Sequence, residues 1–177
     1  MKTLKISSLI IFLITLGGCA DFPTKKFDMN FTVKLNVNTN TTSISSTEIL
    51  KANTNSDFEK YSKKLNSIDI QRITYTVSSS SLPAGLVINS GKIEFAGKGG
   101  NVTLITMSNV DISGNLGKEV DFTLPNQSVT DEFGDLLKNA PNEATLYFTG
   151  STNKGPLVAQ VAIKFYTKAT ARIIGSN

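Results

Sequence analysis

The sequence predicts a mainly β fold, an antiparallel β-sandwich of immunoglobulin-like type with two short helices. Three observations predict it. Apolar and polar residues alternate through several short segments, turn-forming residues recur at roughly the spacing expected of sandwich strands, and only two segments have helical periodicity. A small β-barrel or cup with a ligand cavity is the alternative, because its strands would show the same alternation.

The first strand is expected at residues 31–37, where Phe31, Val33, Leu35 and Val37 alternate with polar residues. The following residues 38–55 are dominated by Asn, Thr and Ser. Such side chains compete with the backbone for hydrogen bonds. This stretch is therefore expected to be a loop or a poorly formed edge strand.

A first helix is expected at residues 57–65. Ser56 and Glu59 have the spacing of a capping box at its start. One stripe of the helix is apolar and the opposite face is basic, which is typical of a solvated surface helix. The apolar stripe contains Phe58, Tyr61 and Leu65, and the basic face contains Lys60, Lys63 and Lys64.

The next apolar residues change phase within one strand, which predicts a β-bulge near Gln71-Arg72 between Ile70 and Ile73. Residues 86–95 are expected to form a tight hairpin, because Asn89-Ser90-Gly91 supplies turn-forming residues between two apolar runs. The glycine-rich residues 97–101 predict a turn and not a phosphate loop, since a strand-like segment follows where a phosphate loop requires a helix.

A short strand at residues 120–124 is expected to end at Pro125. A second helix, which begins near Thr130 and Asp131, is expected to stop at Pro141. The chain should then close with a β-hairpin whose second strand alternates over residues 159–173. The apolar face of the second helix contains Phe133, Leu136, Leu137 and Ala140.

Composition excludes several function classes. The chain has no histidine and a single cysteine, so a Ser-His-Asp triad, a Cys-His dyad and a histidine-ligated metal are excluded. Its basic residues form no cluster larger than the pairs Lys25-Lys26 and Lys63-Lys64, so no nucleic-acid partner is expected. We therefore predict a protein that is not an enzyme.

The carboxylates give no clear site. Asp131, Glu132 and Asp135 lie near the expected start of the second helix, where acids interact favourably with the helix dipole. Residues 111–115 lack the ligand spacing of a calcium loop. No metal and no cofactor are predicted. The remaining acids, which the sequence alone does not pair, are Glu94, Asp111, Glu119 and Asp121.

The N-terminus carries the clearest motif. Lys2 and Lys5 precede a short apolar run at residues 6–16, which is too short to span a bilayer that needs roughly 20 apolar residues. The run ends in Leu16-Gly17-Gly18-Cys19. This segment resembles the lipobox of bacterial lipoproteins. The resemblance implies signal cleavage between Gly18 and Cys19, and acylation of Cys19.

The lipobox divides the chain into a signal peptide (1–18), a lipidated tether (19–29) and a single β-sandwich domain (30–175). Removing the first 18 of 177 residues leaves 159 and lowers the formal net charge from +4 to +2. Acyl chains on Cys19 would make the membrane a partner without a spanning segment. As a whole, the chain is similar to small β-sandwich lipoproteins of the Bacteroidota, many of which have no known function.

The residue after the cysteine is Ala20 and not an aspartate. In the enterobacterial sorting pattern, which the lipobox resemblance brings with it, this implies the outer membrane with the domain facing the periplasm. Exposure at the cell surface is the alternative, although Asp21 is the only acid before Lys25-Lys26.

These observations predict a lipid-anchored, non-catalytic envelope protein that serves as a binding or structural module for a protein partner. The first alternative is a periplasmic carrier of a lipid or another apolar ligand, which would need a cavity of several hundred Å³. The second alternative is a glycan-binding module, although the chain has no tryptophan and only four tyrosines.

Anchoring can be tested by metabolic labelling. Radiolabelled palmitate should enter the wild-type chain in a bacterial host and should not enter Cys19→Ala, because the thiol is the acylated atom. Immunoprecipitation followed by fluorography measures the incorporation. Equal labelling of the two chains would contradict the lipobox assignment.

Overall fold

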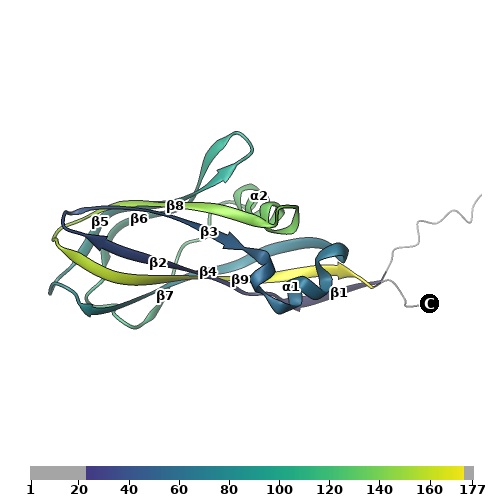
Figure 1. The fold of residues 1–177 in the computed structure, drawn as a ribbon, viewed down its shortest axis with the longest axis horizontal. Coiled ribbons are helices and arrows are strands. Elements are labelled where there is room, and N and C mark those ends of the chain that lie inside the picture. Colours follow the sequence, from purple (N-terminus) through teal and green to yellow (C-terminus); the bar gives the residue numbers. More distant parts are fainter. Residues whose placement is uncertain (1–22, 174–177) are drawn as a thin grey trace, which may run out of the picture.

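The computed structural model describes residues 23–173, so the predicted signal cleavage site and Cys19 lie outside the described residues. The fold is mainly β, with two antiparallel sheets that face each other and two α-helices, as the sequence predicts (Figure 1). One sheet, called sheet A, contains β1 (Thr24–Asp28), β2 (Phe31–Thr39), β4 (Leu65–Ser81), β7 (Glu119–Asp121) and β9 (Leu157–Arg172). The other, called sheet B, contains β3 (Ser43–Lys51), β5 (Val87–Gly97), β6 (Gly100–Asp111) and β8 (Glu143–Thr152).

Strand β9 lies in the middle of sheet A. One of its edges pairs with β1 and then β2 in succession, and its other edge pairs with β4, which in turn pairs with the short β7. Alternate side chains of β9 point into the core from Leu157 to Ala171. The alternation predicted for residues 159–173 is therefore correct except at its end, since Ile173 lies beyond the strand and is 46% exposed.

Sheet B has the order β3-β8-β5-β6, so β3 and β6 are its edges. Among the described strands, β5 and β6 are the only consecutive pair that forms a direct hairpin, with its turn at the glycine-rich residues 97–100. Every later crossing from one sheet to the other uses a loop or a helix. The predicted terminal hairpin is therefore wrong, because β8 belongs to sheet B and β9 to sheet A.

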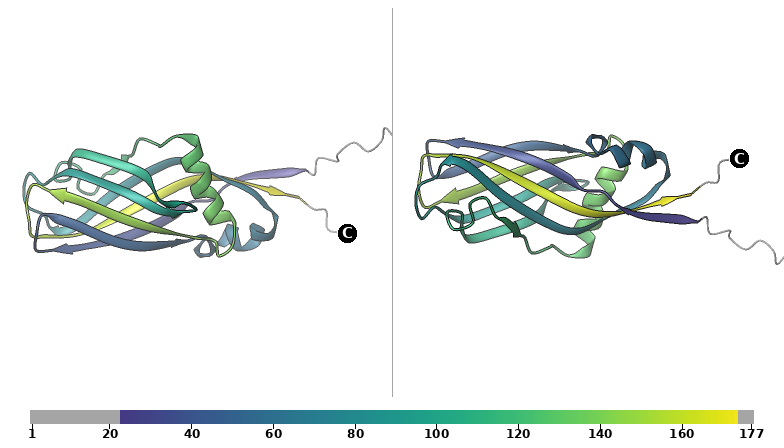
Figure 2. Two further views of the ribbon diagram at one scale, coloured as in Figure 1. Left: turned by 90° about the horizontal axis from the view of Figure 1, so that it is seen from above. Right: turned by 90° about the horizontal axis from the view of Figure 1, so that it is seen from below.

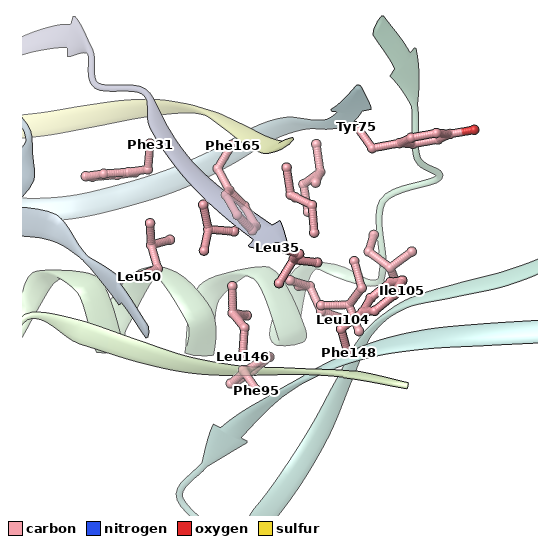
Figure 3. Close-up of a cluster of buried hydrophobic side chains, with 14 of the residues drawn as sticks. Phe31, Leu35, Leu50, Tyr75, Phe95, Leu104, Ile105, Leu146, Phe148 and Phe165 are labelled. Carbon is pink, nitrogen blue, oxygen red and sulfur yellow. The ribbon is translucent and has the colours of Figure 1, made fainter. Parts of the chain in front are cut away.

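The core fills the space between the sheets. Leu35 and Phe165 of sheet A point toward Phe95 and Leu146 of sheet B (Figure 3), and all four side chains are at most 1% exposed. The bulge predicted near Gln71-Arg72 is confirmed by a register shift after Ile70, which keeps both Ile70 and Ile73 in the core.

Helix α2 (Gln127–Lys138) packs over β4 and also contacts β5, β6 and β8, so it crosses strands of both sheets (Figure 2). Its Phe133 ring lies 5.3 Å from that of Phe95 and 5.1 Å from that of Phe165, centroid to centroid. One aromatic side chain of the helix thus joins the two sheets.

Both helices begin earlier than predicted, and each is capped by an asparagine. Asn55 caps α1 (Ser56–Tyr61) by accepting hydrogen bonds from the Asp57 and Phe58 amides, and a 3-10 turn, η3 (Ser62–Lys64), continues it. The predicted Ser56 capping box is thus wrong. Asn126 caps α2 by accepting from the Val129 amide, which is four residues before the expected start at Thr130.

Two further predictions are wrong. The predicted tether at residues 19–29 is in part folded into the domain. Residues 24–28 form β1, Phe27 packs on Tyr61, and Met29 is fully buried. Asn89-Ser90-Gly91 makes no turn, since β5 is a central strand whose neighbours β6 and β8 pair with it on both sides.

The sequence predicts that residues 38–55 form a loop or a poorly formed edge strand. The edge-strand option is correct for β3, and η2 (Ala52–Thr54) follows β3.

Neither helix within residues 23–173 has the length and apolar character that crossing a membrane requires.

Helix α2 approaches β4 at Gly134. A Cβ atom built there would lie 2.1 Å from the backbone oxygen of Ile68. Gly134→Ala should therefore lower the free energy of unfolding by about 1–3 kcal/mol, although alanine ordinarily stabilises a helix by about 1 kcal/mol. Chemical denaturation of residues 20–177 measures the change.

Gly99→Ala is the matched control, because a Cβ at Gly99 meets nothing within 4 Å. It should change the free energy of unfolding by less than about 0.5 kcal/mol. Wild-type stability of Gly134→Ala would contradict the close approach of α2 to β4.

Candidate functional site

The two long sides of the sandwich differ. On one side, β2 and β3 lie against each other and bring the two sheets together. On the other side, the edges are β6 of sheet B and the three-residue β7 of sheet A. Each of these strands is paired along one edge only. A groove lies between them.

We call this groove, of about 390 Å³, the edge groove. Strand β6, the loop after it, and β7 with its following residues form the walls, and β4 contributes Tyr75. Its volume lies in the range of ligand sites, but most of its lining is polar. The lining residues are Tyr75, Thr106, Met107, Ser108, Asn109, Val110, Asp111, Asn115, Val120, Asp121, Phe122 and Thr123.

Tyr75 is the buried polar residue of the edge groove. The side chain is 4% exposed, its ring lies 4.8 Å from that of Phe122, and its hydroxyl points away from the central core residues (Figure 3). The hydroxyl has no hydrogen-bond partner among the described residues. Burial raises the pKa of Tyr75, and the neighbouring Asn115 side chain lowers it by a smaller amount. The hydroxyl therefore stays protonated and can donate to a ligand.

The backbone of β6 is irregular at the groove. Asn109 has a φ of 53°, in the left-handed region that non-glycine residues seldom adopt. The residues paired on either side of it, Ser108 and Val110, keep their register with β5. Such conformations occur at binding sites, where surrounding structure holds them in place.

A second groove, of about 300 Å³, lies on the solvent-facing side of sheet B, and we call it the outer groove. Gly91 and Gly150, which pair across β5 and β8, form part of its lining. The two grooves share Thr106 and Met107, so they flank β6. The remaining lining residues are Ser90, Lys92, Thr103 and Thr149.

Strand β6 itself carries no charged residue from Gly100 to Val110. Edge strands expose unpaired N–H and C=O groups, and proteins commonly block them with charges, prolines or covering segments. The edge of β6 therefore combines three properties: a free backbone, uncharged side chains and a groove on each side.

A polar cluster, here called the Arg72 cluster, ties β7 to the rest of sheet A. Arg72 donates two hydrogen bonds to the carboxylate of Asp121, one of them at 3.2 Å. Glu119 accepts from the hydroxyls of Tyr166 at 2.6 Å and Thr74 at 2.8 Å. The Arg72 guanidinium also lies 5.1 Å from the centroid of the Tyr166 ring. These bonds hold the β7 wall of the edge groove in place.

The Arg72 cluster is poorly suited to acid–base catalysis. Hydrogen bonds from Tyr166 and then Thr74 lower the pKa of Glu119, and the bond from Arg72 lowers that of Asp121. A general acid needs a carboxyl pKa raised toward neutrality. Both carboxylates are instead held in their charged form, which suits a structural role.

The core offers little space for an apolar ligand. Two cavities with apolar linings lie between the sheets, and each has a volume of only about 20 Å³. They share Val77, Ile88, Ile112, Phe148 and Val161. Neither approaches the several hundred Å³ that a lipid carrier requires.

Of the acids considered from the sequence, Glu119 and Asp121 are brought together at Arg72, and those of α2 lie elsewhere. Helix α2 begins at Gln127, so Asp131, Glu132 and Asp135 lie past its first turn, and the helix-dipole explanation is wrong. Glu132 instead accepts a hydrogen bond from the Lys98 amide. Asp111 closes a turn by accepting from the Gly114 amide. Within residues 23–173, no three acidic side chains are grouped so as to hold a metal ion.

Sequence reasoning missed both grooves. Tyr75 follows the apolar alternation of a buried strand, so nothing marked its hydroxyl as part of a groove. The uncharged run at residues 100–110 was a usable signal, but only the strand order shows that it is an edge.

Comparisons with known proteins give only remote structural similarity. No protein-family model matches the chain, and no characterised protein matches it in sequence. A solved structure of Desmodium yellow mottle tymovirus is similar with a TM-score of 0.43 and 11% identity, covering 88% of this chain and 92% of that one. A structure of infectious bursal disease virus, Gx strain, gives a TM-score of 0.29 and 10% identity, covering 87% and 37%.

The Arg72 cluster should make stability depend on pH. The pKa of Asp121 is lower in the folded protein than in the unfolded chain. The charged Asp121 carboxylate therefore raises the free energy of unfolding above the ordinary pKa of about 4, and this stabilisation is lost as the pH falls through the folded pKa. Asp121→Asn should therefore be less stable than wild type at neutral pH, and the difference should shrink below about pH 4. Thermal denaturation across pH measures it.

Arg72→Gln serves as the reciprocal variant. If the two side chains act together, the double variant should be nearly as stable as either single variant. Additive losses, or a stability difference that does not shrink as the pH falls below about 4, would contradict the assignment.

Proposed function

We propose that this chain is a lipid-anchored, non-catalytic binding module of the bacterial envelope, which takes up an extended segment of a partner protein along the free edge of β6. The observation that carries the proposal is the position of β6: an edge strand without charged residues from Gly100 to Val110, with a groove on each side. Each part of the proposal rests on a separate property of the chain.

Strand addition fits the chemistry of this edge. An added strand would satisfy the unpaired backbone groups of β6, and its side chains would alternate between the two faces of sheet B. One set would lie at the edge groove near the Tyr75 hydroxyl, and the other set would lie on the outer face beside Thr103 and Thr106, which line the outer groove from β6. Backbone pairing would supply affinity and the grooves would supply selectivity.

The lipid anchor is supported by Leu16-Gly17-Gly18-Cys19, and the non-catalytic role by residue usage. The chain has no histidine, and acylation of Cys19 would leave it without a free thiol. Figure 1 places β6 and β7 toward the end of the sandwich opposite β1, where the chain leaves for Cys19. The binding edge would then extend away from the membrane.

The edge can be tested by photocrosslinking in living cells. A benzoylphenylalanine residue replaces Ser108 on β6 or, as the matched control, Thr47 on β3, the other edge of sheet B. Both positions are exposed. The Ser108 position should give one discrete adduct and the Thr47 position should give none, because only β6 lies between two grooves.

The crosslinked segment is then made as a synthetic peptide and added to residues 20–177. Pairing with β6 should slow amide hydrogen exchange in residues 100–111 and leave residues 43–51 unchanged. No adduct from Ser108, an adduct with the mass of a second copy of this chain, or a peptide that leaves exchange in 100–111 unaltered would overturn the proposal.

A further inference from the structure

One end of the sandwich is strongly basic. We call it the basic pole and define it as residues 24–28, 56–65 and 168–172, which lie together where β1, α1 and the end of β9 meet (Figures 1 and 2). It contains seven lysine or arginine residues and three acids. The rest of the chain after residue 18 contains nine basic and eleven acidic residues. Positive charge is therefore concentrated at this end.

Folding brings the lysines of two distant segments together. The Lys25 ammonium lies 5.8 Å and the Lys60 ammonium 5.1 Å from the centre of the Tyr61 ring, which also packs on Phe27 at 4.6 Å. The two lysines, first Lys60, lower the pKa of Tyr61. Two cations on one ring mark the centre of the pole.

Most of this charge is not neutralised within the protein. Lys168 pairs with Asp28 at 2.8 Å. Within residues 23–173, no ion pair involves the other lysines of the pole, all of which are exposed: Lys25, Lys26, Lys60, Lys63 and Lys64. They remain open to an external anion.

The short stretch of chain between Cys19 and the start of β1 limits how far the basic pole can lie from Cys19. Five residue steps separate Cys19 from Thr24, and a chain spans at most about 3.6 Å per residue, or roughly 18 Å here. An acylated Cys19 would therefore hold Thr24, the first residue of the pole, within about 18 Å of the membrane surface. This step rests on the proposed lipid anchor.

We infer that the basic pole binds anionic phospholipid headgroups and so orients the sandwich on the membrane that anchors it. Each lysine near an anionic surface strengthens binding about fivefold, and a partly exposed tyrosine such as Tyr61 is typical of the membrane interface. The acyl chains supply attachment, and the lysines supply orientation. The free edge of β6 then extends away from the lipid.

The test uses residues 20–177, which contain every described residue and lack the acylated cysteine. Sedimentation with vesicles compares phosphatidylcholine alone with phosphatidylcholine that contains phosphatidylglycerol. Binding should require the anionic lipid and weaken as salt rises, because screening shortens the range of attraction. The quadruple variant K25Q/K60Q/K63Q/K64Q should bind the anionic vesicles at least about tenfold more weakly.

The control variant K34Q/K92Q/K98Q/K118Q removes the same charge from exposed lysines outside the basic pole. It should retain most of the binding, and circular dichroism checks that both variants are folded. Equal binding to the two vesicle types, or equal loss in the two variants, would overturn the inference. Failure of palmitate labelling at Cys19 would instead refute the anchor, because vesicle binding by residues 20–177 does not use it.

Discussion

Strand β9 is paired along both of its edges, and the arrangement of the other elements depends on it. Strands β1 and β2 occupy one edge in succession and β4 occupies the other. Its alternation places Phe165 and Ile163 in the core and leaves Lys164 and Tyr166 on the outer face. Because β9 comes last in the chain, sheet A is incomplete until residues from both ends of the sequence have met. The core and the basic pole both follow from this pairing.

Closure of the sandwich is unequal, and this asymmetry creates the candidate site. The β2–β3 side is closed, whereas β7 is too short to cover the opposite side, and the Arg72 cluster holds it in position. The other edge strands each carry charge: Lys34 on β2, Glu48 on β3 and Asp121 on β7. From Gly100 to Val110, β6 carries none. The edge strand with this long uncharged stretch is also the one beside two grooves, which is why we place recognition there.

The two proposals assign different tasks to different parts of one elongated molecule. Anchoring and orientation belong to the end where β1, α1 and β9 meet, and recognition belongs to the free edge of β6. Correcting the predicted tether connects them: because β1 begins at Thr24, only a few residues separate the folded domain from Cys19. A longer tether would have let the basic pole move away from the headgroups.

Sequence alone determined what depends on neighbours along the chain. Alternation placed most strands and their buried faces, the phase change at Ile70 to Ile73 predicted the bulge, and Leu16-Gly17-Gly18-Cys19 carries the resemblance to a lipobox on which the proposed anchor rests. Strand partners were not predictable, because all described pairings except β5–β6 join strands that are not consecutive. Asn89-Ser90-Gly91 has turn chemistry, yet pairing on both sides keeps it extended. The edge groove and the pole exist only after those pairings form, since β-sheet hydrogen bonds join backbones whatever their separation in sequence.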